Sequence, residues 1–319
     1  MHIKTAIIGL GGIGLNYDYN LKNFFYSHAK CLEKNKNFKL CFGVDHDYTQ
    51  LKKFNKKYKI DCFQDLKEGF KKFSPEFVVI SVPTEKHYDV FQKVIKYKFV
   101  RFILLEKPGG SNYSELKKMI DIAKKKKIKL FVNYPRLYSN YYSKLIINLK
   151  KSFKFNIFVF YSRGISNNCS HYISFLNLFL KKIIKINILK IHKKFANDFQ
   201  ADFELYYKNA KITFVHNNHK DLLHTEILIN SDKGKWLSVK SFSEFLFFRR
   251  KNNFQIKGAF DYDNKFLLLK NYQNSLLNNV YNKIYSHIKK KSSLKSKYKN
   301  FLQTHKTIEN IKNKIVNFR

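Results

Sequence analysis

IKTAIIGLGGIG, at residues 3–14, is a short apolar run that ends in the pattern Gly9-x-Gly11-x-x-Gly14. The apolar run predicts a buried strand, and the glycines predict a sharp turn from that strand into a helix. In such a turn Gly9 permits the tight bend, Gly11 lets a diphosphate approach the backbone, and Gly14 lets helix and strand pack closely. The N–H groups and the dipole at the helix start attract phosphate. This stretch therefore predicts a dinucleotide site.

A carboxylate at the end of the second predicted strand supports the same interpretation. Residues 38–44 have a strand pattern, and Asp45 follows them. An aspartate there can accept both ribose hydroxyls of an adenosine and would repel a 2′-phosphate, so NAD is favoured over NADP. Asp45 lies further from the glycines than the usual spacing of about 20 residues, and we interpret residues 15–26 as an insertion. The alternative is that Asp45 only caps a helix beginning near Tyr48.

Length and composition indicate a two-domain globular protein. The chain has 319 residues, of which 44% are hydrophobic. It contains no run of about 18 uncharged apolar residues, so no membrane span is expected. The first apolar run is needed for the first strand, so we expect neither a secretion signal nor a membrane partner. Four cysteines without CxxC spacing predict no metal site and no disulfide framework, which favours a cytoplasmic location.

The formal net charge of +39 would suit a protein that binds nucleic acid. However, only six of the 62 basic residues are Arg, and the lysines accompany abundant Asn, Ile, Phe and Tyr, which all have AT-rich codons. The lysines are also spread along the chain rather than gathered in one stripe. We therefore attribute the charge to codon bias and expect no specific nucleic-acid partner, with a polyanion-binding protein as a further alternative.

Strand and helix patterns alternate over the first 135 residues. Strands are predicted at 3–8, 38–44, 60–63, 77–82, 101–105 and 128–132, and helices near 47–58, 65–72, 86–97 and 114–126. This alternation predicts a doubly wound parallel sheet with helices on both faces, which is a Rossmann domain. Ligands bind at the carboxyl ends of such strands, so segments 82–84, 106–108 and 133–136 are candidate site loops.

The pattern changes from about residue 150. Strands are predicted at 153–162, 185–195, 199–207, 211–216, 225–230, 235–239 and 245–248, and helices at 171–182 and 294–315. Successive strands with short turns predict a large, open, mainly antiparallel sheet. The predicted fold class is α/β. It has a Rossmann domain at 1–135 and an α+β domain for substrate binding and oligomerisation at 136–319, whose last helix can pack back on the first domain.

Four motifs in order resemble the Gfo/Idh/MocA oxidoreductases. They are the glycine pattern, Val79-Ile80-Ser81-Val82-Pro83-Thr84-x-x-His87, Glu106-Lys107-Pro108, and a later helix start that ends in His171. The resemblance implies a nicotinamide cofactor, a small carbohydrate substrate and a homo-oligomer, either a dimer or a tetramer. The Tyr17-Asp18 insertion, Ser27-His28, and Arg163-Gly164 resemble a branch associated with sugar metabolism and surface-polysaccharide synthesis. His28 is similar to the family's histidine on the first helix, displaced by the insertion.

The resemblance places Lys107 where the substrate meets the nicotinamide. An amine or ammonium there can bond to the reacting oxygen and steady its developing charge. Family members commonly carry Asp four residues before the second-domain histidine, whereas this chain has Asn167, and an amide cannot act as a base. Lys107 and His171 are therefore expected to carry the acid–base chemistry. The alternatives are a solvated Lys107, and a helix capped by Asn167 or Asn168 with His171 packed inward.

The candidate site combines the motifs with the resemblance. The residues expected at the cofactor are Gly9, Gly11, Gly12, Ile13, Gly14, Asp45, Thr84, His87 and Glu106. Those expected to bind substrate are Tyr134, Arg136, Arg163 and Asn168, with Lys107, His171 and Asn167 as catalytic residues and no metal. The predicted activity is hydride transfer between NAD and a hydroxyl or carbonyl group of a sugar, nucleotide sugar or polyol. A catalytically silent NAD-binding regulator of the same fold is the alternative, because Asn167 replaces Asp.

Overall fold

The computed structural model describes residues 2–195, 198–217, 225–271 and 276–318. Two compact units divide the chain. The first comprises residues 1–139 and 273–302, and the second comprises residues 140–272 and 303–319. The first unit therefore includes a segment from near the C-terminus as well as the N-terminal part of the chain. One helix, α9 (Lys295–Val316), begins in the first unit and ends in the second.

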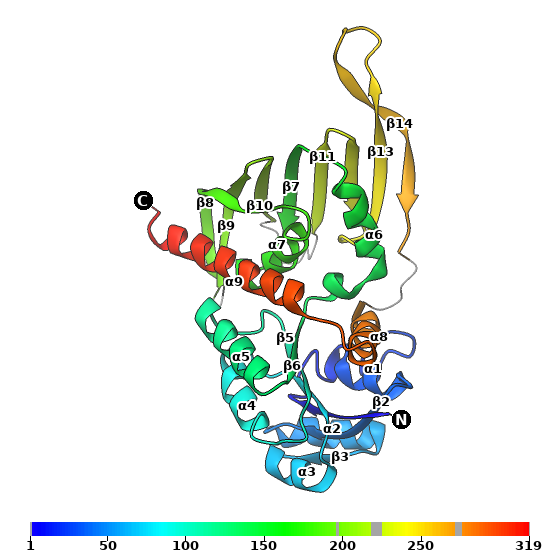
Figure 1. Ribbon diagram of the computed structural model, residues 1–319, viewed down its shortest axis with the longest axis vertical. Helices are drawn as coiled ribbons and strands as arrows, with labels where there is room; N and C mark the ends of the chain where they lie inside the picture. Colours follow the sequence, from blue (N-terminus) through cyan, green and yellow to red (C-terminus); the bar gives the residue numbers. More distant parts are fainter. Residues whose placement is uncertain (1, 196–197, 218–224, 272–275, 319) are drawn as a thin grey trace. The chain divides into compact units, whose positions relative to one another are not determined.

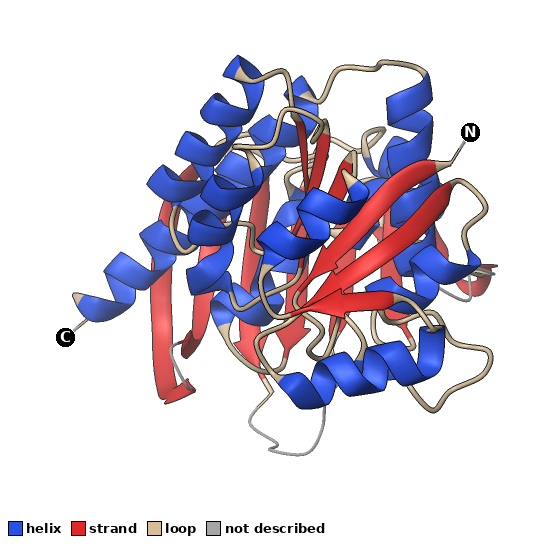
Figure 2. Cartoon of the chain, turned by 90° about the horizontal axis from the view of Figure 1, so that it is seen from below, coloured by secondary structure: helices blue, strands red, loops and turns tan. Residues whose placement is uncertain are grey.

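A parallel sheet of six strands forms the centre of the first unit, in the order β3-β2-β1-β4-β5-β6. The strands are β1 (Ile3–Ile8), β2 (Phe38–Val44), β3 (Asp61–Phe63), β4 (Phe77–Ile80), β5 (Phe102–Glu106) and β6 (Lys129–Asn133). β4 is buried along its whole length, as is typical of a strand covered on both faces. Figure 2 shows helices on either side of these strands. The predicted Rossmann fold is confirmed.

Among the described residues, nine helices lie within the first unit. They are α1 (His28–Lys34), α2 (Tyr48–Tyr58), α3 (Leu66–Phe73), α4 (His87–Val94), α5 (Tyr113–Lys125) and α8 (Leu276–Lys289), with short helices η1 (Asn16–Asp18), η2 (Thr84–Lys86) and η3 (Pro135–Tyr138). Four of them, α1, α2, α3 and α5, begin at a polar side-chain cap. The side chain of Asp47 accepts the Thr49 N–H and caps α2. The interpretation of Asp45 as the cap of this helix is therefore wrong.

Aromatic residues of β2 pack on both faces of the six-stranded sheet. The register between β1 and β2 shifts by one residue after Thr5, and this shift places Phe38 and Phe42 on opposite faces. Phe38 contacts the Tyr281 ring of α8, with ring centroids 5.5 Å apart. Phe42 packs edge-on against Phe70 of α3, with centroids 5.7 Å apart. The segment that returns from the C-terminal part of the chain thus completes the core of the first unit.

An eight-stranded sheet forms the second unit, in the order β14-β13-β12-β11-β7-β10-β9-β8. The strands are β7 (Phe155–Tyr161), β8 (Ile183–Phe195), β9 (Asp198–Tyr207), β10 (Ala210–His216), β11 (Glu226–Ser231), β12 (Gly234–Val239), β13 (Glu244–Asn252) and β14 (Phe260–Leu269). β7 and β10 pair in parallel, and the other neighbours are antiparallel. The mainly antiparallel second sheet is confirmed.

Helices cover one face of this sheet and leave the other face open (Figure 1). The covering helices are α6 (Asn140–Leu149), a π-helical turn η4 (Ile165–Cys169), α7 (Ser170–Leu176) and the last part of α9. Phe242 packs beneath them, with its ring 5.1 Å from that of Phe175 and 5.8 Å from that of Tyr142. On the open face the Phe160 side chain is 44% exposed. The helix predicted at 171–182 ends at Leu176, earlier than expected.

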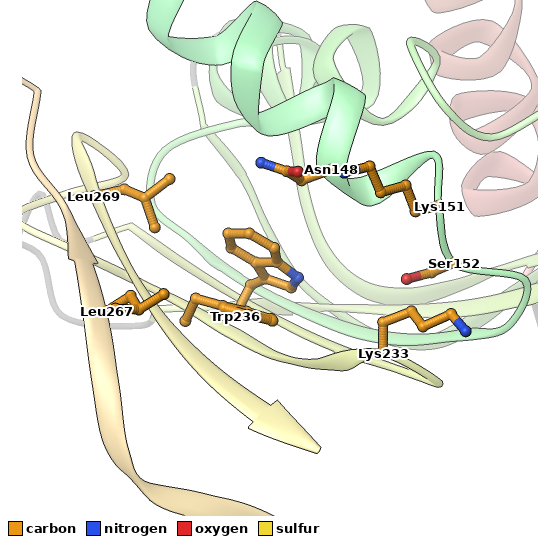
Figure 3. A pocket seen from close by; sticks show the side chains of 8 residues that line it. Asn148, Lys151, Ser152, Lys233, Trp236, Leu267 and Leu269 are labelled. Atoms are coloured by element: carbon orange, nitrogen blue, oxygen red, sulfur yellow. The ribbon is translucent and has the colours of Figure 1, made fainter. Parts of the chain in front are cut away.

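A cavity of about 440 Å³ lies between α6 and strands β12, β13 and β14 (Figure 3). Its floor is Trp236, which stacks on Phe247 with ring centroids 4.1 Å apart. Its lining residues are Asn148, Lys151, Ser152, Lys233, Trp236, Phe247, Leu267 and Leu269. None of these residues is among those predicted for the cofactor, the substrate or catalysis.

Candidate active site

The glycine turn after β1 is tightly packed on one side and open on the other. Gly9 has a φ of 98°, a left-handed conformation that favours glycine. A Cβ at Gly9 would lie 2.6 Å from the carbonyl carbon of Ser81, and a Cβ at Gly14 would lie 2.1 Å from the carbonyl oxygen of Gly9. At Gly11, in contrast, no atom of the described residues lies within 4 Å of the Cβ position, apart from those of its two chain neighbours. The turn therefore has the open space that a diphosphate needs.

A helix starts at this turn, but the insertion interrupts it. His28 and Ala29, the first residues of α1, donate their N–H groups to the carbonyl oxygens of Ile13 and Gly14, at 2.9 and 3.0 Å. These hydrogen bonds join the glycine turn to α1 as in one helix, and residues 15–27 form a loop inserted between Gly14 and His28. This arrangement agrees with the interpretation of residues 15–26 as an insertion, and it places His28 at the start of the first helix.

Several backbone N–H groups of the glycine turn, where this helix begins, are unpaired. Within the described part of the chain, the amide groups of Gly11, Gly12, Ile13 and Gly14 have no acceptor. Unpaired N–H groups and the positive end of the dipole are the features of a helix start that bind phosphate. The geometry of the turn therefore fits the diphosphate of a dinucleotide.

Asp45 lies beside the glycine turn. Its Oδ2 accepts the Leu10 N–H at 2.6 Å, and its Oδ1 accepts the Asp47 N–H at 3.0 Å. Each carboxylate oxygen can accept more than one hydrogen bond, so both keep capacity for a ribose hydroxyl. The side chain is 9% exposed, and the two backbone bonds hold it in place. The structure thus brings together Asp45 and the glycines that the sequence predicted.

Glu106, at the end of β5, is held by three donors. Its Oε1 lies 2.9 Å from His28 Nε2 and accepts the Asn133 side-chain N–H at 2.5 Å, while its Oε2 accepts the Lys107 N–H at 3.3 Å. On the other side of the imidazole, His28 Nδ1 lies 2.6 Å from the Tyr281 hydroxyl. A buried chain of side chains therefore links α8 and α1 to the Glu106-Lys107-Pro108 motif.

The charge of this cluster follows from its contacts. Burial raises the pKa of Glu106, but the hydrogen bond and charge of His28, with smaller effects of Asn133 and Lys107, outweigh burial and lower it. An ionised carboxylate only accepts hydrogen bonds, so His28 Nε2 is the donor. Oε1 of Glu106 accepts two of these bonds and Oε2 accepts one, so Glu106 positions the backbone of the half-buried Lys107, and its contact with the cofactor stays a prediction.

His87 braces two strand-end loops. Its Nδ1 lies 3.1 Å from the carbonyl oxygen of Gly109, and its Nε2 lies 3.0 Å from that of Val82. Burial lowers the pKa of the imidazole, so the ring is neutral near pH 7 and donates to one carbonyl at a time. The ring is buried and turned to backbone on both sides, which favours a positioning role over the predicted cofactor contact. Thr84 is half-buried at the start of η2.

Tyr134 and Arg136 follow β6. Tyr134 is 1% exposed, belongs to the hydrophobic core of the first unit and stacks on Phe301, with ring centroids 6.0 Å apart. The Tyr134 ring is thus part of the core, and its role in substrate binding stays a prediction. Arg136 is half-buried in η3.

In the second unit, Asp198 determines the start of the helix that carries Asn167 and His171. The Asp198 carboxylate accepts the N–H groups of Ser166 and Asn167 at 3.0 and 2.9 Å. A Cβ at Gly164 would lie 2.3 Å from the same carboxylate, so glycine is required there. The cap therefore comes from β9, and the prediction that Asn167 or Asn168 caps this helix is wrong. The Asn167 side chain is exposed and His171 is half-buried.

Two other predicted substrate residues lie at the same end of the second sheet. Arg163 follows β7 with a φ of 62° and an exposed side chain. The side-chain oxygen of Asn168 is buried without a hydrogen-bond partner among the described residues. An unpaired buried acceptor is costly unless a ligand or water satisfies it, which supports the predicted role of Asn168 in binding a hydroxyl group.

The sequence prediction missed several members of these clusters. Asn133 lies in a segment that the strand-end rule singled out, but it was not among the chosen residues. Tyr281 and Asp198 are distant in sequence from their partners, and no local pattern identifies them. Among the described residues no helix combines the length and apolar character needed to cross a membrane. That part of the chain also holds no group of three His, Cys, Asp or Glu side chains placed to bind a metal.

Comparison with known proteins agrees with the geometry of the first unit. Residues 3–134 match the GFO_IDH_MocA family model, described as an oxidoreductase family with an NAD-binding Rossmann fold. Among curated proteins, none matches the sequence of this chain.

Solved structures resemble the chain over nearly its whole length. An oxidoreductase from Agrobacterium radiobacter, in complex with NAD+, L-tartaric acid and magnesium, has a TM-score of 0.74 at 13% identity, with 100% of this chain and 98% of that chain covered. UDP-N-acetylglucosamine 3-dehydrogenase from Acidithiobacillus ferrooxidans has a TM-score of 0.76 at 11% identity, covering 98% and 97%. A 3-ketoreductase from Actinomadura kijaniata, in complex with NADP, has a TM-score of 0.76 at 10% identity, covering 98% and 97%. At these identities the likeness shows a shared fold.

Proposed function

We propose that this chain, whose residues 3–134 match the model of the Gfo/Idh/MocA oxidoreductases, a family with an NAD-binding Rossmann fold, transfers hydride between NAD and a sugar, nucleotide sugar or polyol. The observation that carries this proposal is the glycine turn, with unpaired N–H groups and open space at Gly11 beside the Asp45 carboxylate. Two structural neighbours are a UDP-sugar dehydrogenase and a ketoreductase, which supports a carbohydrate substrate with a hydroxyl or carbonyl group at the reacting carbon.

NAD is the proposed cofactor, with NADP less favoured. The N–H groups of residues 11–14 would bind the diphosphate, and Asp45 would accept the ribose hydroxyls. A 2′-phosphate would place negative charge against the Asp45 carboxylate, whose only ion-pair contact among the described residues is with the exposed imidazole of His46, at 3.2 Å. When bound, the nicotinamide supplies the hydride acceptor or donor. Solved neighbours are bound to NAD+ or to NADP, so the preference rests on Asp45.

Lys107 is the proposed acid–base group of the first unit. Its backbone N–H is fixed by Glu106, which His28 and Asn133 hold in turn. The Lys107 amine would bond to the reacting oxygen, and take or give the hydroxyl proton while hydride leaves or arrives at the same carbon. From the second unit we assign His171 as a second acid–base group, Asn167 as a hydroxyl-binding partner, and Arg163 and Asn168 as further substrate-binding residues.

The experiment that tests this proposal measures cofactor binding and turnover separately. Lys107→Ala should bind NAD+ as the wild type does in calorimetry, but its turnover should fall by about 10²- to 10⁴-fold, the usual contribution of a general acid or base. Lys117→Ala, on the exposed surface of α5, is the matched control and should keep full activity. A thermal-shift panel of UDP- and CMP-sugars, sugar acids and inositols with NAD(H) identifies the substrate class. Absence of NAD(H) binding, or full turnover by Lys107→Ala, would contradict the mechanism.

A catalytically silent NAD-binding regulator is the second candidate, and Asn167 in place of Asp is the observation that favours it. Such a protein would bind NAD(H) but leave every sugar of the panel unchanged, and Lys107→Ala would not alter binding to its protein partner. We further propose a cytoplasmic homo-oligomer without a nucleic-acid partner or membrane anchor. The exposed apolar residues of the open sheet face support the oligomer. The four cysteines, all within the described residues, form no disulfide, which suits a reducing compartment.

A further inference from the structure

The insertion at residues 15–27 has a definite structure built around a buried charge. The Asp18 side chain is fully buried, and its carboxylate accepts the N–H groups of Tyr26 and Ser27 at 2.6 and 2.9 Å and the Ser27 hydroxyl at 2.5 Å. Three donors on one buried carboxylate hold the far end of the loop against the start of α1, because Ser27 is also the cap of that helix.

The insertion is also attached to α2, the helix that follows Asp45. The Asn16 side-chain N–H donates to Gln50 Oε1 at 2.9 Å, and the Tyr19 hydroxyl donates to the carbonyl oxygen of Lys53 at 3.2 Å. The Lys57 ammonium lies 4.4 Å from the centre of the Tyr19 ring and also donates to the Tyr19 carbonyl oxygen. Residues 16–19 therefore lie between the glycine turn and α2 and are fixed to both.

These attachments place Tyr17 directly on the glycine turn. A Cβ at Gly12 would lie 2.6 Å from Tyr17 Cε1 and 3.1 Å from the Tyr17 hydroxyl oxygen, so the ring covers the Gly12 backbone. The ring is nevertheless 60% exposed. One edge of the Tyr17 ring therefore packs on the backbone, and the rest of the ring is open to solvent. Its hydroxyl group is a hydrogen-bond donor that lies next to the unpaired N–H groups.

We infer that Tyr17 is a cofactor-contacting residue and that residues 15–27 hold it against the diphosphate of the bound dinucleotide. The inference rests on the proposed function, because it assumes that a dinucleotide occupies the glycine turn. The Tyr17 hydroxyl donates to a diphosphate oxygen, and it adds to the backbone N–H groups a donor that carries no charge. The insertion therefore contributes to cofactor affinity rather than to substrate choice.

The test compares ligands that share or lack the diphosphate, using full-length protein and calorimetry. Tyr17→Phe removes only the hydroxyl, and Tyr17→Ala removes the ring as well. Tyr26→Ala is the matched control, because Tyr26 lies in the same insertion but stacks on Phe24, with ring centroids 5.4 Å apart. We expect Tyr17→Phe to raise the Kd of NAD+ and of ADP-ribose about tenfold, as for a lost hydrogen bond to a charged group. The affinity for adenosine should stay unchanged, and Tyr26→Ala should bind all three ligands as the wild type does.

Each other outcome has a defined meaning. Wild-type affinity in Tyr17→Phe, or tighter binding by Tyr17→Ala, would overturn the inference while leaving the proposed function intact. An equal loss of affinity in Tyr26→Ala would assign the effect to the insertion as a whole and overturn the direct contact. If the wild-type protein binds neither NAD+ nor ADP-ribose, the proposed function itself fails. The ligand-free variants should have the same unfolding temperature as the wild type, which would show that the loop and the turn remain folded.

Discussion

Replacing Gly11 by alanine separates the fold of the first unit from its capacity to bind a dinucleotide. Apart from its two chain neighbours, no residue that the structure describes has an atom within 4 Å of the Cβ position at Gly11, and the Gly11 backbone is not in the left-handed region. The added methyl group therefore meets nothing in the ligand-free protein. Its effect on stability should stay within about 0.5 kcal/mol, as for surface substitutions, with a small gain expected from a stiffer unfolded chain.

The same methyl group occupies the space where a diphosphate would approach the unpaired N–H groups. Hydrogen bonds to a charged oxygen contribute about 1.5–3 kcal/mol each. If the displaced diphosphate loses one or two of them, binding weakens by about 3 kcal/mol, which is about a 100-fold rise in Kd. Gly14→Ala should instead lower the stability of the ligand-free protein, because its Cβ would lie 2.1 Å from the Gly9 carbonyl oxygen and must distort the turn itself.

Calorimetric titration with NAD+ and thermal unfolding of the ligand-free protein measure the two effects independently. The expected result is a Gly11→Ala variant with wild-type unfolding temperature and a Kd about 100-fold higher. Wild-type affinity in this variant would show that the diphosphate does not lie at Gly11, and the assignment of the cofactor site would be wrong. A large fall in the unfolding temperature without ligand would show instead that the space at Gly11 is not open.

Four further predictions concern the rest of the molecule. Asp45→Ala should weaken NAD+ binding by about tenfold, through loss of hydrogen bonds to ribose, and reduce the preference for NAD+ over NADP+, as competition titrations would show. Burial and neighbouring lysines lower the pKa of His287 from 6.5 to about 4, so protonation favours the unfolded chain. Above pH 6.5 the imidazole is neutral in both the folded and the unfolded chain, so it does not reduce the free energy of unfolding. That free energy should fall as the pH drops from 6.5 toward 4, and urea unfolding should show a smaller fall over this range in His287→Gln than in the wild type. Trp236→Ala should lower the free energy of unfolding by about 3–5 kcal/mol without changing the Kd of NAD+, because Trp236 is buried in the second unit, whereas the predicted cofactor residues all belong to the first unit. Phe160→Glu should reduce the molar mass measured by light scattering, and an unchanged mass would show that the open sheet face is not the interface.

The sequence predicts the Rossmann sheet well because its signals are local. Five of the six strands contain a short apolar run, β3 (Asp61–Phe63) being the exception, and the glycine pattern and Asp45 come at strand ends. The antiparallel strands of the second unit were predicted where buried residues alternate with more exposed ones along the strand, as they do in β7. β14 was missed because most of its residues are exposed and no alternation marks a buried face. α8 was missed because asparagines dilute a helical pattern that Leu277, Val280 and Ile284 still follow.

The contacts of the candidate site depend on partners that the sequence does not bring together. Glu106 and Lys107 were predicted from one motif, but the side chains that hold Glu106 come from α1 and β6, 78 and 27 residues away. His87 looked like a cofactor ligand in the motif, and only the structure shows both ring nitrogens turned to backbone carbonyls. Asn167 and Asn168 looked like helix caps because cap preferences are local, whereas the actual cap is Asp198, 31 residues further along the chain.

The return of residues 273–302 to the first unit affects how the protein is made. His28 and its partner Tyr281 are 253 residues apart, and Phe38 packs on the same tyrosine. While the ribosome synthesises the chain, the N-terminal sheet therefore emerges with this apolar surface uncovered until α8 leaves the exit tunnel. Nascent chains with such surfaces are prone to aggregate. A truncated product ending near residue 139 should consequently be insoluble, and supplying residues 273–302 as a separate peptide should increase its solubility.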